Sequence, residues 1–249
     1  MAALDGKTAL VTGASRGIGA AIARQLASDG AEVVMTYAGS AAKAEQVAND
    51  INSEGGAARV VQADVSSPDS VSHLFESVDR MFGDGLDILV NNAGVAEHSA
   101  IQQGELDEYD RIFRVNVRGT FDVTRHAVQR LRDQGRIITI GSCLALRAVF
   151  PTMGVYSASK AALAGFTRGW AQDLGPRGIT VTCVQPGSID TDLNPDTAEN
   201  EYAPVLRDLP ALKRFGKAEE IAHLVAFLAS SGSSYLTGQT VTADGGLNA

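Results

Sequence analysis

Cysteine is scarce in this chain of 249 residues, which contains only Cys143 and Cys183. Two cysteines that do not form a CxxC pair exclude a disulfide framework and a cysteine-rich zinc site. No apolar run reaches the roughly 18 residues that span a bilayer, and the sequence does not open with a basic segment followed by a long apolar one. We therefore expect a cytoplasmic protein with reduced thiols, no membrane segment and no catalytic metal.

A surplus of positive charge is also missing. The chain has 21 Lys and Arg against 29 Asp and Glu, a formal net charge of −8. An acidic surface is unfavourable for nucleic acid and for anionic membranes, so we expect neither as a partner. What the chain does have is 45% hydrophobic residues, enough for a large core, and a length that suits one α/β domain.

Short, β-rich apolar segments alternate with longer amphipathic segments along the whole chain. This order predicts a parallel sheet that is covered by helices on both faces, in a single domain over residues 1–249. The near-continuous Val, Ile and Leu of the strands fits burial on both sides. The expected strands are 7–12, 31–37, 58–64, 86–92, 135–141, 179–185 and 240–244. The expected helices are about 17–29, 40–54, 67–83, 105–132, 154–174 and 217–230.

The segment 188–215 breaks this alternation. It is polar and holds three of the seven prolines in the chain. A long irregular insertion in a compact domain is typical of a lid or of a disordered loop. We favour a substrate lid, because the segment follows a strand end, where parallel sheets bind their ligands.

A glycine-rich turn lies between the first strand and the first helix, in the sequence TGASRGIGAAIARQLASDG. Its glycines are Gly13, Gly17 and Gly19. Glycine permits the sharp turn and lets the backbone approach a pyrophosphate, while the helix N-terminus offers free N–H groups and a partial positive charge. This position at the start of an α/β chain predicts a dinucleotide site rather than a plain turn.

The end of the second strand indicates which dinucleotide binds. An NAD site normally has an acidic residue there, on the ribose 2′-OH. In this chain Glu32 comes too early and Glu45 too late, whereas Arg16 lies in the glycine turn and Ser40 and Lys43 follow the strand. An available guanidinium without a repelling acid favours a 2′-phosphate, so we predict NADP(H).

Tyr156 and Lys160 are four residues apart in a segment of small residues, so they share one face of the expected helix. A phenol titrates near pH 10, and an adjacent ammonium is expected to lower that pKa and make the phenol a better acid–base catalyst. Ser142 ends a strand and can hold a substrate oxygen beside the phenol. Asn116 lies inside a predicted helix, where Asn is unfavourable, which indicates a local bend or a water-bridged hydrogen bond.

The chain resembles the short-chain dehydrogenase/reductase family over essentially its full length. The resemblance rests on TGASRGIG (12–19), Asp64, NNAG (91–94), Asn116, Ser142, YSASK (156–160), PGSIDT (186–191) and TGQTVTADGG (237–246). Within the family it is most similar to the 3-oxoacyl-[acyl-carrier-protein] reductases and related ketone reductases. The resemblance implies a single-domain Rossmann fold with a doubly wound, seven-stranded parallel sheet.

The resemblance also implies a role for each residue. Tyr156 is expected to protonate the carbonyl oxygen, Ser142 to hydrogen-bond it, Lys160 to bind the nicotinamide ribose, and Asn116 to hold a water of a proton relay. The residues expected to bind the cofactor are Gly13, Ser15, Arg16, Gly17, Ile18, Gly19, Tyr37, Ser40, Asp64, Val65, Asn92, Ala93, Gly94, Tyr156, Lys160, Pro186, Gly187, Ile189 and Thr191.

Substrate and assembly are expectations of the same kind. A homotetramer, with a dimer as the alternative, is expected to form through the helices 105–132 and 154–174. The loop 143–155 is bulky and apolar, which favours a small or aromatic ketone over a carrier-protein thioester; Arg130, Arg132 and Arg177 are the candidate docking charges for an acidic carrier. A non-catalytic NADP(H) sensor or scaffold, and an NAD-linked epimerase or dehydratase, are the remaining alternatives.

Overall fold

The computed structural model describes residues 3–83, 85–197 and 199–249, so the predicted domain and lid include residues 1, 2, 84 and 198 that lie outside the described part. Its centre is a seven-stranded sheet in which every pair of neighbours is parallel, and this confirms the predicted fold. In spatial order the strands are β3 (Ala57–Gln62), β2 (Glu32–Tyr37), β1 (Thr8–Val11), β4 (Leu86–Asn91), β5 (Leu131–Ile140), β6 (Thr180–Pro186) and β9 (Gln239–Ala243).

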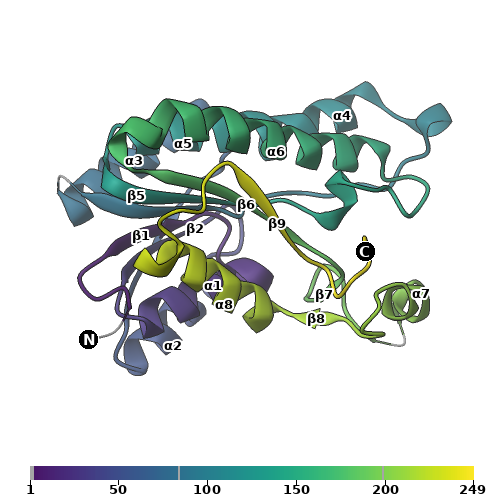
Figure 1. Cartoon of the computed structure of the whole chain (residues 1–249), viewed down its shortest axis with the longest axis horizontal. Helices are drawn as coiled ribbons and strands as arrows, with labels where there is room; N and C mark the ends of the chain where they lie inside the picture. The colour runs from purple at the N-terminus through teal and green to yellow at the C-terminus, as the bar shows by residue number, and fades with distance from the viewer. Residues whose placement is uncertain (1–2, 84, 198) are drawn as a thin grey trace.

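Helices cover both faces of the sheet (Figure 1). One face packs against α1 (Gly17–Ser28), α2 (Ala41–Ser53) and α8 (Ala218–Ala229), and the other against α3 (Pro68–Phe82), α5 (Thr120–Val128) and α6 (Gly154–Leu174). Neighbouring strand residues enter opposite cores, because side chains alternate along a strand: Val33 packs with α1 and α2, and Val34 with α3. This is why the strands are apolar throughout rather than alternating.

Local sequence accounts for the helix boundaries, as α3 illustrates. The Ser67 hydroxyl accepts a hydrogen bond from the Ser70 N–H, and Pro68 occupies the first turn, where its missing N–H costs nothing. Four residues spaced for one helix face, Val71, Leu74, Phe75 and Val78, are buried against the sheet. Each stabilises the fold by about 1.5–3 kcal/mol through removal of apolar surface from water.

The helix predicted over 105–132 is not continuous, which corrects that expectation. It consists of α4 (Leu106–Phe113), a π-helical turn labelled η2 (Arg114–Gly119) and α5, and it ends at Val128. The strand β5 already begins at Leu131, where it pairs with Leu86 before a register shift. The π turn carries Asn116, and the hydrogen bonds of that side chain account for the wider turn, as described below.

The segment 188–215 has more regular structure than the sequence suggested. The short strand β7 (Ile189–Asp190) pairs in parallel with β8 (Gly216–Lys217), and the helix α7 (Ala203–Asp208) lies between them in the chain. In Figure 1 this segment projects at the carboxyl end of the sheet, on the same side as the C-terminus of the chain. The remaining short helical turns are η1 (Ile101–Gln103), η3 (Cys143–Ala145), η4 (Gly175–Arg177) and η5 (Ser231–Ser233).

No helix within the described ranges combines the length and the apolar character needed to cross a membrane.

Candidate active site

The glycine turn is joined to the end of β4 by a dense set of hydrogen bonds. The Asn92 amide donates to the carbonyl oxygens of Thr12 and Gly13, both at 2.9 Å, and the Thr12 hydroxyl accepts from the N–H groups of Asn92 and Ala93. Gly13 has φ +65°, and a Cβ there would lie 2.8 Å from the Ala93 Cα; a Cβ at Gly19 would collide with the Asn92 amide. Only glycine fits at either position.

The start of α1 is suited to an anion. No side chain of the described residues caps this helix, and its first turn has no acidic residue. The N–H groups and the positive end of the helix dipole are therefore available to a pyrophosphate, which also needs the close backbone approach that the glycines allow. A Cβ at Gly17 would lie 3.4 Å from the Thr191 methyl, so the loop after β7 faces the glycine turn. Ser15 and Ile18, also in this turn, are half-buried.

The residues expected at the adenosine 2′-position come together at the end of β2. Tyr37 ends the strand, and Ser40 immediately precedes α2. Lys43 donates to the Asp192 carboxylate at 2.7 Å, and the positive charge of Arg16 also acts on that carboxylate. Both cations therefore lie near the same carboxylate, so they are close to each other in the fold.

The acids near this strand are placed as the sequence indicated. Glu32 lies at the amino end of β2 and pairs with Arg59 at 2.8 Å, away from the groove. Asp64 follows β3, is exposed, and accepts a hydrogen bond from the Ser66 N–H. The next residue, Val65, is buried against Gly119 of the π turn. Within the described residues, no acid directly follows β2 along the chain, and the carboxylate at this end of the groove is that of Asp192, which Lys43 binds.

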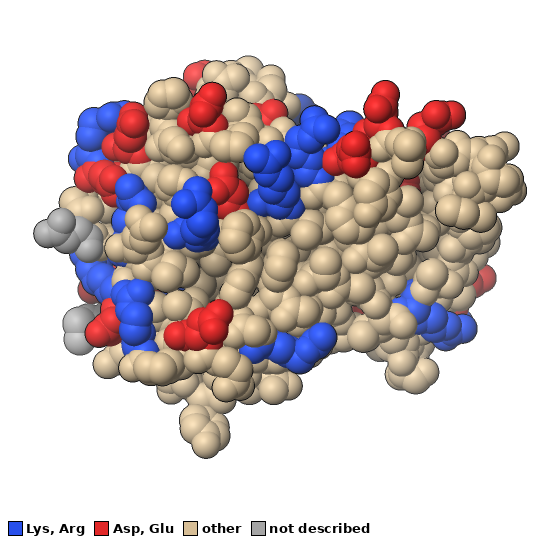
Figure 2. Space-filling view, turned by 90° about the horizontal axis from the view of Figure 1, so that it is seen from above, with Lys and Arg blue, Asp and Glu red and all other residues tan. Residues whose placement is uncertain are grey.

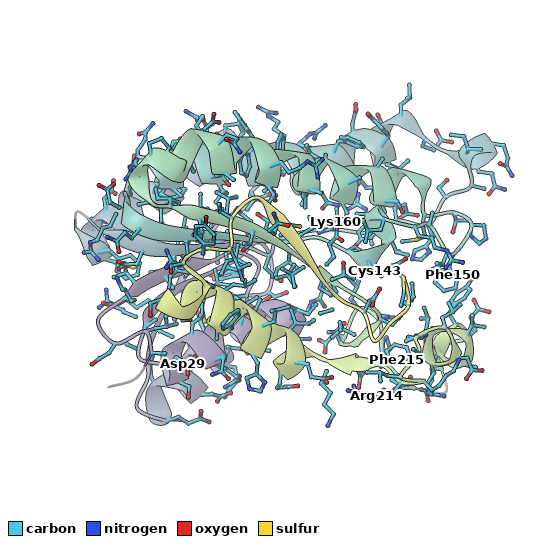
Figure 3. The ribbon with its side chains drawn as sticks, in the orientation of Figure 1. Asp29, Cys143, Phe150, Lys160, Arg214 and Phe215 are labelled. Atoms are coloured by element: carbon cyan, nitrogen blue, oxygen red, sulfur yellow. The ribbon has the colours of Figure 1, made fainter. Side chains whose placement is uncertain are left out.

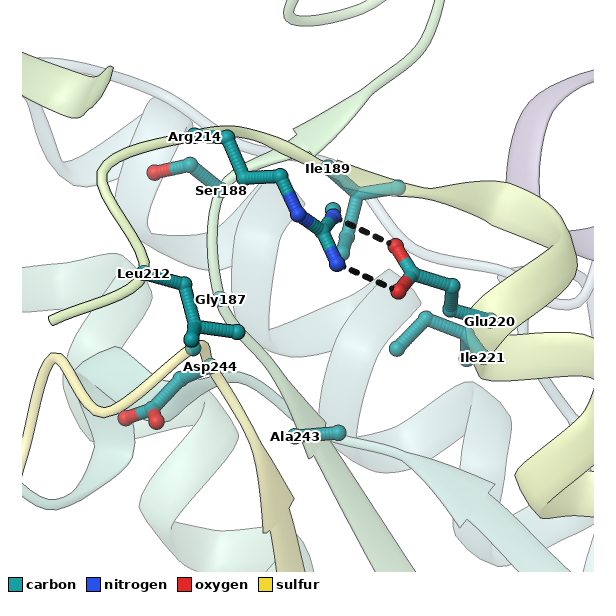
Figure 4. Close-up of a pocket in the computed structure, with 11 residues that line it drawn as sticks. Gly187, Ser188, Ile189, Leu212, Arg214, Glu220, Ile221, Ala243 and Asp244 are labelled. Carbon is teal, nitrogen blue, oxygen red and sulfur yellow. Dashed lines mark hydrogen bonds and ion pairs between the residues drawn. The ribbon is translucent and has the colours of Figure 1, made fainter. Parts of the chain in front are cut away.

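The nicotinamide end of the groove is formed by the loop after β6. Pro186 ends the strand, the Gly187 N–H donates to the Ala243 carbonyl oxygen at 3.0 Å, and Ile189 is buried. A pocket of about 160 Å³ lies beside this loop, and Figure 4 shows Arg214 and Glu220 paired at its wall. The two Arg214–Glu220 contacts are 2.8 and 2.7 Å long, so this ion pair ties the end of the lid to α8.

Asn116 is fully buried in the π turn and is held from three directions. Its Oδ1 accepts from the Val95 N–H at 2.8 Å, and its Nδ2 donates to the Val95 carbonyl oxygen at 2.9 Å and to the Ser159 hydroxyl at 3.0 Å. Ser159 in turn donates to the Tyr156 carbonyl oxygen. These bonds require the wider turn, which explains why Asn occurs inside a helix here. They also join the end of β4 to the helix of Tyr156.

The Lys160 side chain is buried between the ends of β4 and β5 and the helix α6, and we call this space the crevice. Its ammonium donates to the Ile140 carbonyl oxygen at 2.9 Å and lies 5.8 Å from the centre of the Tyr156 ring. A Cβ at Gly94 would be 3.3 Å from both the ammonium and the Asn116 Oδ1, so these three residues meet. Burial lowers the pKa of Lys160 from 10.5 to about 8, and the nearby Cys183 thiol opposes this shift.

Tyr156 differs from the prediction in its protonation. Burial raises its pKa from 10.0 to about 12, the Ser142 hydroxyl opposes this through a hydrogen bond, and Cys143 adds to it. We expected the Lys160 ammonium to lower this pKa. That expectation is corrected, because the ammonium is directed at the Ile140 carbonyl oxygen, while the desolvation of the phenolate has the largest effect. The phenol is protonated at neutral pH, and the raised pKa makes it a weaker acid than an exposed tyrosine.

The family model described as "Enoyl-(Acyl carrier protein) reductase" matches residues 13–248 of the chain. A short-chain dehydrogenase/reductase from Serratia marcescens has a solved structure that is 47% identical, with a TM-score of 0.96, over 99% of this chain and 100% of that one. The chain belongs to the short-chain dehydrogenase/reductase family. It is an oxidoreductase of that family, as the sequence resemblance predicted.

Two further relatives are informative. Versicolorin reductase stcU of Emericella nidulans is 43% identical, and the alignment covers 98% of this chain and 96% of that protein. A short-chain dehydrogenase from Burkholderia cenocepacia, solved in complex with NADP, is 47% identical with a TM-score of 0.95, over 99% of this chain and all of that one.

In this short-chain dehydrogenase/reductase the candidate docking arginines are already paired within the chain. Arg130 binds Asp79, Arg132 binds Asp87, and Arg177 binds Asp133 together with the carbonyl oxygens of Val128 and Leu131. These contacts lie around the amino end of β5, whereas Ser142 follows its carboxyl end. The structure therefore places the three arginines away from the Ser142 end of β5, and their docking of a carrier protein stays a prediction.

Sequence reasoning missed two residues that hold this site together. Thr12 connects the glycine turn to β4, and Ser159 connects Asn116 to the Tyr156 helix. Both lie inside quoted motifs, but a hydroxyl between small residues has no local signal of its own. The hydrogen-bond partners of these two hydroxyls come close to them only when β1, β4 and α6 pack together in the fold.

Proposed function

We propose that this protein is an NADP(H)-dependent carbonyl reductase that converts a ketone to a secondary alcohol, reversibly. One observation carries the proposal: a protonated phenol, a serine hydroxyl and a buried ammonium share the crevice at the carboxyl end of the sheet. NADPH supplies the hydride. Ser142 and Tyr156 hold the carbonyl oxygen, and as the new C–H bond forms at carbon, the Tyr156 hydroxyl transfers its proton to that oxygen.

Lys160 and Asn116 have supporting roles in this scheme. The buried Lys160 ammonium, 5.8 Å from the centre of the Tyr156 ring, resupplies the proton that Tyr156 gives up, since its pKa of about 8 keeps it protonated near neutral pH. The buried Asn116 amide, bonded to Val95 and Ser159, keeps the crevice wall and the helix of Tyr156 in register. A sensor or scaffold has no need of this combination, which is why an enzyme is favoured.

NADP(H) is the cofactor in this proposal. The end of β2 has no carboxylate to meet a ribose 2′-OH, while Arg16 and Lys43 offer positive charge beside the groove. The similar protein from Burkholderia cenocepacia, which was solved with NADP, supports this choice. Fluorescence titration with NADPH and NADH tests it: NADPH is expected to bind at least about tenfold more tightly, since a charge-assisted contact contributes about 1.5–3 kcal/mol. Equal or tighter NADH binding would overturn it.

A small or aromatic ketone is the proposed substrate class, with a 3-oxoacyl thioester as the alternative. Met153 is buried beside the start of α6, and Leu146, Leu193 and Leu212 expose apolar side chains on the loops and lid around the crevice. The paired docking arginines at the opposite end of β5 weigh against a carrier protein. The segment 188–215 is proposed to act as the substrate lid, hinged where Arg214 binds Glu220.

A homotetramer is the proposed assembly, with a dimer as the alternative. The outer face of α4, α5 and α6 carries a groove whose apolar lining, Phe113, Val117, Phe121 and Phe166, is joined by the charged residues Asp110, Arg114 and Arg118. Phe166 stacks on Trp170 with ring centres 4.7 Å apart. Figure 2, seen from the side of these helices, shows a broad surface without charges between clusters of Lys, Arg, Asp and Glu. A light-scattering mass of one chain at micromolar concentration would contradict both assemblies.

The proposed compartment is the cytoplasm, which fits two free, buried cysteines.

The reaction itself is tested by the loss of NADPH absorbance with a panel of ketones. Tyr156→Phe is expected to bind NADPH normally and to lose roughly 10²–10⁴-fold in kcat, because the proton donor is gone. The matched control is Tyr235→Phe, which removes a hydroxyl from a fully exposed side chain and should leave kcat unchanged. Full turnover by Tyr156→Phe would show that the proton comes from another group.

A further inference from the structure

The last residues of the chain form a compact turn, residues 244–248, which we name the C-terminal turn. The Asp244 carboxylate accepts hydrogen bonds from the N–H groups of Gly246 at 2.9 Å, Leu247 at 3.2 Å and Asn248 at 3.0 Å. These bonds satisfy a carboxylate that directly follows β9, and Leu247 is buried. The turn is therefore a built structure rather than a frayed end.

This C-terminal turn contacts the walls of the proposed substrate crevice. The Leu212 N–H of the lid donates to the Gly245 carbonyl oxygen at 3.0 Å. A Cβ at Gly187, in the loop at the nicotinamide end of the groove, would lie 2.6 Å from the Asp244 Cα. On its other side, the Asn248 amide donates to the Cys143 carbonyl oxygen at 3.2 Å and to the Asp244 carboxylate at 2.9 Å. Figure 3 shows Cys143 beside the C-terminal end of the ribbon.

The Cys143 carbonyl oxygen belongs to the turn that orients the Ser142 hydroxyl. Ser142 precedes η3, and its Oγ accepts a hydrogen bond from the Leu144 N–H at 3.2 Å. Because one lone pair of this oxygen is engaged, its hydrogen remains available to be donated toward the Tyr156 oxygen or a substrate carbonyl. The η3 turn has only three residues and one further bond at Cys143, from the Leu146 N–H at 3.1 Å. The Asn248 amide donates the second hydrogen bond to that carbonyl oxygen, from a residue far along the chain.

We propose that Asn248 is a positioning residue for the Ser142 hydroxyl, which it holds in place through the Cys143 carbonyl oxygen and η3. The inference rests on the proposed carbonyl reductase function. The same C-terminal turn also accepts a hydrogen bond from the Leu212 N–H of the lid. The turn therefore contacts both η3 on one side of the crevice and the lid on the other. A shift of a hydroxyl by a fraction of an ångström is enough to weaken a bond to a carbonyl oxygen in the transition state.

Kinetics provide the first test. Asn248→Ala and the similarly sized, uncharged Asn248→Leu, neither of which can donate to a carbonyl oxygen, are each expected to lower kcat by about 5- to 10-fold, the effect of one misplaced hydrogen bond. Binding of NADPH should change less than about twofold, since the side-chain hydrogen bonds of Asn248 among the described residues go to Cys143 and Asp244 rather than to the glycine turn. The control is Asn52→Ala, which removes a similar side-chain donor to the Ala58 carbonyl oxygen at the opposite edge of the sheet and should leave kcat unchanged.

The pH dependence of alcohol oxidation separates positioning from a general structural effect. Oxidation needs the Tyr156 phenolate, and the Ser142 hydroxyl lowers the pKa of Tyr156. A misplaced hydroxyl should therefore move the midpoint of the rate profile to higher pH in both Asn248 variants. Cys143 and Lys160, the other titratable groups at Tyr156, are unchanged in the variants. An unchanged midpoint together with an unchanged kcat would overturn the proposal.

Thiol reactivity provides a readout that needs neither substrate nor nucleotide. Cys143 is buried at 3% exposure, and Cys183 is fully buried, so alkylation by iodoacetamide followed by peptide mass analysis reports each loop separately. Asn248→Ala should alkylate Cys143 at least about fivefold faster than the unaltered protein, with Cys183 unaffected, because the η3 turn opens more often. Faster alkylation with unchanged kcat would refute the positioning of Ser142. If the unaltered protein reduces no ketone, the proposed function is refuted. Faster Cys143 alkylation in the variant would then still show that Asn248 stabilises the η3 turn.

Discussion

The buried Lys160 ammonium is expected to reduce the folding stability of the protein, and the size of this reduction follows from its burial. The side chain is 5% exposed, and its pKa falls from 10.5 to about 8 in the fold. Since one pH unit corresponds to about 1.4 kcal/mol, holding this ammonium in the core at pH 7 costs about 3 kcal/mol of folding free energy. Lys160→Met removes the charge and keeps the length of the side chain.

The expected gain is smaller than this cost, because Lys160 also donates to the Ile140 carbonyl oxygen. Loss of that bond costs about 1 kcal/mol, so Lys160→Met should be about 2 kcal/mol more stable than the unaltered protein at pH 7. The pKa is lowered in the fold, so the cost is complete below pH 8, declines as the pH rises and vanishes near 10.5. At pH 9.5 the cost is about 1 kcal/mol, which the lost hydrogen bond offsets, so the two proteins should be nearly equally stable there.

The assay is equilibrium urea denaturation without nucleotide, at pH 7 and pH 9.5 and at one fixed protomer concentration. The matched control is Lys43→Met, which replaces an exposed lysine and should change stability by less than about 0.5 kcal/mol at either pH. The reasoning is refuted if Lys160→Met is less stable at pH 7, or if its advantage is the same at both pH values. The variant should also lose ketone reduction, so that stability and activity change in opposite directions.

Two further predictions concern the groove. Because burial raises the pKa of Tyr156 to about 12 and lowers that of Lys160 to about 8, ketone reduction should keep a constant kcat between about pH 5 and 7 and fall above about pH 8 as Lys160 loses its proton, whereas alcohol oxidation should accelerate as the pH rises; a reduction rate that already falls at pH 7 would contradict this assignment. Asp192→Asn should tighten NADPH binding by about two- to fivefold at low salt, because it frees Lys43 and removes a negative charge near Arg16. Isothermal titration at low and at 0.5 M salt, a concentration of about three times physiological, checks this: an effect that salt does not reduce would point away from electrostatics.

The amino-acid sequence alone determined the architecture and most members of the site. The alternation of apolar strands with amphipathic helices is a local pattern, and so is the glycine spacing that Gly13 and Gly19 require for close packing against β4. Tyr156 and Lys160 were recognisable because a helix places residues four apart on one face. The missing acid after β2 was equally visible in the sequence. Each of these features depends on neighbours in the chain and on backbone geometry.

Tertiary structure decided the energetics of those residues and their partners across the crevice. Lys160 turns to the Ile140 carbonyl oxygen rather than neutralising the phenol, because a buried ammonium must satisfy its hydrogen bonds. Asn116 imposes a π turn through Val95, a residue 21 positions away. The C-terminal Asn248 meets the loop of Ser142 from 105 positions along the chain. Desolvation and long-range contacts depend on which elements pack together, and no local pattern in a sequence encodes that.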